Sequence, residues 1–171
     1  MIALAPAVPS FTLPIGGMPW FWRDLEAERI GEVLPLVLAA DPGGTEAAFW
    51  LRDARDRLAA ASSGGGVVIV QCLAGLTLAL FFHRRGTAPD SRPRLVVDRL
   101  RWLELGRPHR SLDALVASVL QTARRRGCAD VLLEAGACVE ERARAALDQQ
   151  VREAGFVEEG GGWRCPTPAA F

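Results

Sequence analysis

The apolar positions between residues 94 and 126 define the centre of this chain. In RLVVDRLRWLEL (94–105), apolar and polar residues alternate with a rough period of two, and β-branched and aromatic residues are frequent. This pattern predicts a strand that is covered on both faces. We expect Val96, Leu100 and Trp102 on one side of it and Val97 and Leu103 on the other.

A helix is predicted after the short polar connection GRPHR (106–110). In SLDALVASVLQTARRRG (111–127), apolar residues fall on one helical stripe, Ser111 suits the N-cap and Gly127 suits the C′ position. Because exposed N–H groups at a helix start attract anions, we expect an anion-binding turn at residues 107–112.

The elements before residue 94 are predicted from the spacing of apolar residues and from the positions of proline, glycine and capping residues. Residues 19–25 predict a strand, and a helix with a kink or break at Pro35 should follow it. The expected buried side of this helix is Ile30, Val33, Leu34, Val37 and Leu38. Thr45 should cap a second helix that ends near Ala61. Two β-rich runs joined at Ala74-Gly75 then predict a hairpin, so that 67–73, 76–84 and 94–105 form an antiparallel meander.

After the central helix, residues 130–134 predict a short buried strand parallel to 94–105, because a helical crossover joins the two. A helix from about Val139 to Ala154 and a glycine-turn hairpin over 156–165 complete the chain. The order β-α-α-β-β-β-α-β-α-β-β predicts a single α/β domain with a mixed sheet and helices on both faces. We expect an N-terminal arm (1–18), one domain (19–165) and a C-terminal tail (166–171).

Composition narrows the classes of function. The 171 residues carry 20 basic and 20 acidic side chains, so a strongly basic footprint for nucleic acid is absent. The four cysteines lack the spacing of a zinc site, which predicts no metal and reduced thiols. The N-terminus lacks a basic n-region, and the longest apolar run is interrupted by Gln71 and Gly75. We therefore expect a cytoplasmic protein without a membrane segment.

The order of elements, together with the Gly-Phe that ends a helix in VREAGFVEE, resembles the GNAT N-acyltransferase superfamily over residues 19–165. That family binds the acetyl-CoA pyrophosphate at the central strand-to-helix junction, with a Q/R-x-x-G-x-G/A fingerprint. Here Arg107 stands at its first position, whereas Arg110 and Leu112 replace its small residues. The resemblance implies acetyl-CoA or another acyl-CoA as co-substrate. The implied binding residues are Trp102, Leu103, Arg107, His109, Arg110, Ser111 and Leu112.

Transfer to an amine requires a group that takes the amine proton. Asp98 and Glu104, which we expect beside Leu100 and Trp102, and Glu134 on the neighbouring strand are the candidate bases; each is alternatively a surface or ion-paired carboxylate. The family's acid is a Tyr at the position of Val151, and this chain has no Tyr. Cys138 is a candidate substitute; alternatively it is a small buried apolar residue, as free cysteines more often are.

The acceptor wall and proton transfer each have further candidate residues. Phe49, Trp50 and Arg52 are candidates for the wall of the acceptor site, although Trp50 equally suits the core. His83 predicts a solvated strand end rather than a catalytic group.

Two functions remain open from the sequence. The first is a GNAT-type N-acyltransferase that acts on an amine of a small molecule or protein. The alternative is a catalytically inactive GNAT-like domain that serves in binding or assembly, as in a homodimer.

Overall fold

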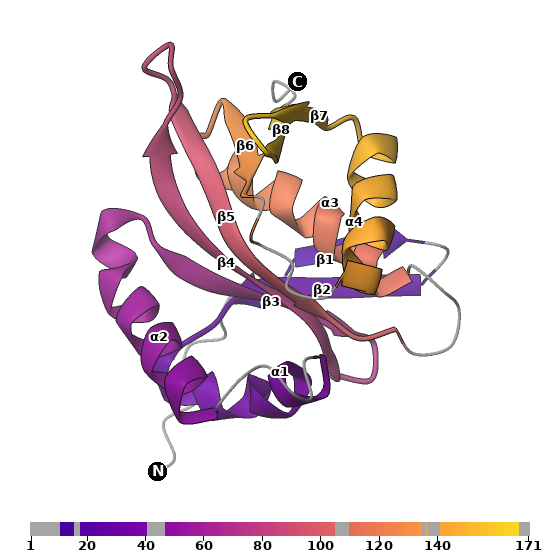
Figure 1. Cartoon of the computed structure of the whole chain (residues 1–171). Helices are drawn as coiled ribbons and strands as arrows, with labels where there is room; N and C mark the ends of the chain where they lie inside the picture. The colour runs from indigo at the N-terminus through magenta and orange to yellow at the C-terminus, as the bar shows by residue number, and fades with distance from the viewer. Residues whose placement is uncertain are drawn as a thin grey trace.

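The computed structural model describes residues 11–15, 18–40, 47–104, 110–134, 136 and 141–167. In these residues, eight strands form one sheet in the order β1-β2-β3-β4-β5-β6-β8-β7 (Figure 1). The strands are β1 Phe11–Ile15, β2 Met18–Asp24, β3 Gly66–Cys72, β4 Thr77–Thr87, β5 Pro93–Trp102, β6 Asp130–Leu133, β7 Val157–Glu159 and β8 Gly162–Pro166. The helices are α1 Leu34–Ala40, α2 Ala47–Ala59, α3 Arg110–Arg125 and α4 Glu141–Glu153, with 3-10 helices at Ala27–Val33 and Ala60–Ser63.

The predicted sheet is confirmed. β3, β4 and β5 form an antiparallel meander, and β6 lies parallel to β5 after the α3 crossover. The β3–β4 turn contains Gly75 at φ 77°, a conformation that glycine adopts without steric cost. One strand was not expected: β1, in the predicted N-terminal arm, pairs antiparallel with β2 at the edge of the sheet.

Helices cover both faces of the sheet, as predicted (Figure 1). α3 packs over a core that includes Phe81, Leu95 and Leu115, while α1 and α2 cover a second core around Trp50 and Phe82. The two cores share the strands between them, so the sheet is buried on both faces. No helix among the described residues is long and apolar enough to cross a membrane.

Next to Pro35, where a kink or a break was predicted, the helix changes type without interruption: the 3-10 helix Ala27–Val33 passes directly into α1 at Leu34. Pro35 lies in the first turn of α1, and its nitrogen donates no hydrogen bond to the preceding 3-10 helix. The expected burial of Leu38 is wrong: Leu38 is 40% exposed, and Leu36 is buried instead. The change from 3-10 to α geometry alters the angular spacing of the side chains and so moves the buried face.

A β-bulge in β5 changes which side chains share a face. Phe82 lies opposite Arg99 and His83 lies opposite Val97, so Asp98 is the extra residue. A bulge reverses the alternation beyond it. Leu100 therefore joins Val97 in the core under α3, and our expectation that these two residues face opposite sides is wrong.

Candidate functional site

The candidate site lies where the parallel strands β5 and β6 diverge, or part. Their parallel pairing runs from Arg94 and Asp130 to Val97 and Leu133, and the last bond of the ladder joins the Glu134 N–H to the Val97 carbonyl at 2.9 Å. β5 then continues to Trp102 without pairing to β6. Within the part of the chain that the structure describes, no strand pairs with that side of β5 beyond the bulge.

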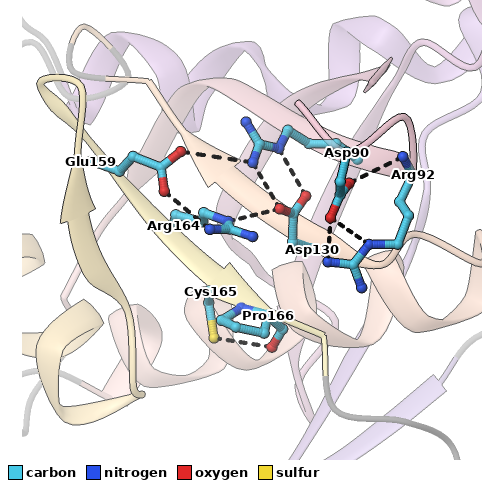
Figure 2. A network of polar contacts seen from close by, with 8 residues as sticks. Asp90, Arg92, Asp130, Glu159, Arg164, Cys165 and Pro166 are labelled. Atoms are coloured by element: carbon cyan, nitrogen blue, oxygen red, sulfur yellow. Dashed lines mark hydrogen bonds and ion pairs between the residues drawn. The ribbon is translucent and has the colours of Figure 1, made fainter. Parts of the chain in front are cut away.

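At the other end of the same pair, a buried ion cluster holds the strands together (Figure 2). The Asp130 carboxylate, 1% exposed, accepts two hydrogen bonds from Arg94 at 2.8 and 2.7 Å and one from Arg164 of β8 at 2.8 Å. The hydrogen bond from Arg94 holds the pKa of the Asp130 carboxyl below its usual range, although burial opposes this effect. The cluster fixes β5, β6 and β8 at one end, while β5 and β6 part at the other.

The bulge directs two consecutive side chains of β5 toward α2. The Asp98 carboxylate accepts a hydrogen bond from Arg57 at 2.6 Å, and Arg99 pairs with Asp53 at 2.8 Å. The expectation that Asp98 shares a face with Leu100 is consequently wrong. No bulge was expected there, although two adjacent polar residues between Val97 and Leu100 were a signal for one.

Two of the three candidate bases meet beside the parting strands. Arg84 of β4 donates a hydrogen bond to Glu134, and its guanidinium lies 3.9 Å from Asp98. The Glu134 side chain is 39% exposed, whereas that of Asp98 is 14% exposed and paired with Arg57. The structure therefore places Asp98 and Glu134 in one cluster on the face that α2 covers.

Glu104, the third candidate base, lies at the start of α3. Its carboxylate accepts hydrogen bonds from the backbone N–H groups of Ser111 at 3.4 Å and Leu112 at 3.2 Å. The Ser111 hydroxyl, expected to cap the helix, instead donates to the Leu103 carbonyl at 2.6 Å. Glu104 is thus the capping acceptor, a contact that sequence reasoning missed because the two groups are seven residues apart.

The other predicted binding residues are distributed around this junction. Trp102 packs against the core under α3, while Leu103 packs against the core under α1 and α2. Leu112 is fully buried, so its side chain belongs to the core and its backbone N–H alone faces the junction. Arg110 is the first residue of α3. Arg107, His109 and Cys138 lie outside the described residues.

The expectation for His83 is wrong. Its side chain is 0% exposed on the α3 face of the sheet, beside Gly66 and Arg126. Burial, with a smaller contribution from Arg126, lowers the pKa of His83 to about 4. The imidazole is therefore a neutral core group of β4, opposite Val97 and on the face of the sheet away from Asp98 and Glu134.

The remaining candidates have mixed placements. Trp50 is 2% exposed and belongs to the core, whereas Phe49 is 56% exposed on α2 and Arg52 is also exposed. Val151, at the position of the family's acid, is 0% exposed in the core under α3. A side chain at that position points into packed apolar groups.

No family model matches the chain, and neither does the sequence of any curated protein. Solved structures do match. A GNAT-family acetyltransferase from Listeria monocytogenes has a TM-score of 0.62 at 12% identity, over 91% of this chain and 99% of that one. A chain of the NatC complex bound to Gag peptide and CoA has a TM-score of 0.58 at 15% identity, over 86% of this chain and 98% of that one. An aminoglycoside 6'-N-acetyltransferase from Acinetobacter baumannii has a TM-score of 0.58 at 14% identity, over 81% of this chain and 91% of that one. The chain therefore has the fold of the GNAT-family acetyltransferases, as the order of its elements predicted.

Proposed function

We propose that this protein is an acyl-CoA-dependent N-acyltransferase that transfers the acyl group of acetyl-CoA or another acyl-CoA to an amine of a small molecule or protein. The observation that carries the proposal is the parting of β5 and β6 beside both a helix N-terminus and an acidic cluster. The NatC chain, which has the same fold, was solved with CoA and a peptide.

In the proposed complex, the linear arm of acyl-CoA lies against the unpaired part of β5, beyond Val97. Backbone N–H and C=O groups of a strand edge suit the amides of such an arm. The phosphates lie at the start of α3, where the N–H groups of Ser111 and Leu112 and the guanidinium of Arg110 can bind them. Trp102 and Leu103 flank this path. These assignments keep the co-substrate on one continuous route from the helix to the parting strands.

The acceptor amine approaches Asp98 and Glu134 from the α2 face. Its nitrogen lone pair attacks the thioester carbonyl carbon, the carbon–sulfur bond breaks, and the CoA thiolate leaves. We assign the amine proton to Glu134, which accepts it directly or through water, because this carboxylate is the more exposed of the two. Arg84, held by both carboxylates, positions them relative to each other.

The departing thiolate takes its proton from water in this scheme. Val151 stands at the position of the family's general acid, but it is buried in the core. A side chain at this position therefore does not reach outward to protonate the thiolate. Turnover is therefore expected to be slow compared with an enzyme that has a positioned acid, by about a hundred- to ten-thousand-fold.

One observation favours the second candidate function, a catalytically inactive GNAT-like domain that binds or assembles. The anion-binding groups at the start of α3 already hold the carboxylate of Glu104. A domain that no longer binds acyl-CoA would have no need to keep those N–H groups available.

Two measurements on the purified protein separate the candidates. Acetyl-CoA, CoA and longer acyl-CoAs should raise the thermal unfolding midpoint, since a ligand of the native state stabilises it. Thiol release from acetyl-CoA should then depend on an added amine, tested with a panel of small amines and peptide N-termini. Binding without amine-dependent release would favour the inactive domain, and no shift with any acyl-CoA would refute the acyltransferase.

A further inference from the structure

Glu104 occupies the two N–H groups that the proposed function gives to the co-substrate. Its Oε1 atom accepts from Leu112 at 3.2 Å and its Oε2 atom accepts from Ser111 at 3.4 Å. The Ser111 hydroxyl makes a different contact and donates to the Leu103 carbonyl at 2.6 Å. In the described part of the chain, the carboxylate of Glu104 is thus the anion bound at the start of α3.

We propose that Glu104 is an intramolecular competitor of the acyl-CoA pyrophosphate and thereby sets the affinity of the site for the co-substrate. This inference rests on the proposed function. A pyrophosphate and a carboxylate cannot accept from the same two N–H groups at once, and two anions at one helix terminus repel each other. Acyl-CoA therefore binds only after the Glu104 side chain turns away.

The surroundings of Glu104 make this exchange reversible. Glu104 is exposed, so its carboxylate can leave the helix for solvent without becoming a buried, unpaired charge. The two hydrogen bonds are long for contacts to a carboxylate, which indicates a weak cap. The Glu104 carboxylate therefore lowers the affinity of the site for acyl-CoA but does not prevent binding.

The size of the effect follows from the strength of such a cap. The interaction between a carboxylate and a helix N-terminus is strong enough that losing it changes a competing ligand's binding constant by about two- to fivefold. Replacing Glu104 should therefore tighten pyrophosphate binding by about that factor, with the larger gain where no acceptor atom remains. The gain should be absent for a ligand that carries no phosphate.

The experiment compares the parent protein with Glu104→Gln, Glu104→Ala and the matched control Glu158→Gln, whose carboxylate is exposed on β7. Calorimetric titrations use CoA, ADP and pantetheine, which lacks the pyrophosphate. Thermal unfolding without ligand verifies that each variant is folded. We expect CoA and ADP to bind both Glu104 variants about two- to fivefold more tightly, with Ala above Gln. Pantetheine should be unaffected, and the control should equal the parent.

The outcomes distinguish this inference from the proposed function. Equal CoA affinity in the parent and both Glu104 variants overturns the competitor and leaves CoA binding intact. A gain that pantetheine shares also overturns it, because Glu104 would then act elsewhere than at the pyrophosphate. If none of the four proteins binds CoA, the proposed function fails and the competitor with it.

Discussion

Replacing Asp130 tests whether the buried ion cluster holds the end of the β5–β6 pair. Asp130 is 1% exposed, and the side chain of its partner Arg94 is 8% exposed. The change Asp130→Ala leaves the guanidinium of Arg94 buried without its carboxylate. Removing one partner of a buried pair costs about 3–5 kcal/mol of unfolding free energy. That cost is a large share of the roughly 5–15 kcal/mol by which a domain is stable.

Urea unfolding followed by fluorescence measures the loss. With a slope of about 2 kcal/mol per molar urea, the midpoint should fall by about 1.5–2.5 M at pH 7. Asp130→Asn should lie between Ala and the parent, because the amide oxygen still accepts a hydrogen bond. The matched control is Asp90→Asn, since Asp90 pairs with Arg92 at the surface and should change the midpoint little.

The pH dependence gives a second check on the same cluster. Because the folded-state pKa of Asp130 is lowered, its contribution is present above the ordinary Asp pKa of about 3.9 and is lost as the pH falls through the folded value. The gap between parent and Asp130→Asn should thus shrink only in acid. If Asp130→Ala were as stable at pH 7 as the control Asp90→Asn, the view that this cluster holds the strands together would be refuted.

Three further predictions concern single residues. His83 has its pKa lowered to about 4, so the unfolded state takes up a proton that the folded state refuses between the two values. Between pH 7 and pH 4, the unfolding free energy of the parent should fall by up to about 3 kcal/mol more than that of His83→Phe. Urea midpoints that change equally with pH in both proteins would contradict this. Glu134→Gln should lower kcat for thiol release by about a hundred- to ten-thousand-fold with CoA binding retained, and unchanged kcat would exclude Glu134 as the base. Val151→Tyr should lower the unfolding free energy by about 1–3 kcal/mol, because the core has no room for the ring. The same change should not speed thiol release.

The sheet was predictable because its signals are local. Alternating apolar residues, the glycine at the β3–β4 turn and a helix between β5 and β6 specify pairing and direction without knowledge of distant contacts. β1 was missed because Pro9, Pro14 and the adjacent glycines indicated an irregular arm. An edge strand tolerates proline better than a central one, and Pro14 lies in such a strand.

The site was predictable only in part, because its contacts depend on positions far apart in the sequence. Asp98 and Glu134 were proposed from their strands, but their link through Arg84 requires the β4–β5–β6 register. The bulge places Leu100 on the α3 face, away from Asp98, and periodicity alone does not place a bulge. His83 was misjudged because the end of α3, more than forty residues later in the chain, covers it.

The most direct test of the central claim is an NMR titration of the isotopically labelled protein with CoA, following backbone amides. The amides of Ser111, Leu112 and Glu134 report on the start of α3 and on the point where β5 and β6 part. The account predicts that all three shift and saturate with one Kd, while the amides of Arg94 and Asp130 at the opposite end stay unchanged. Shifts confined to the Asp130 end, or no shifts at saturating CoA, would contradict it.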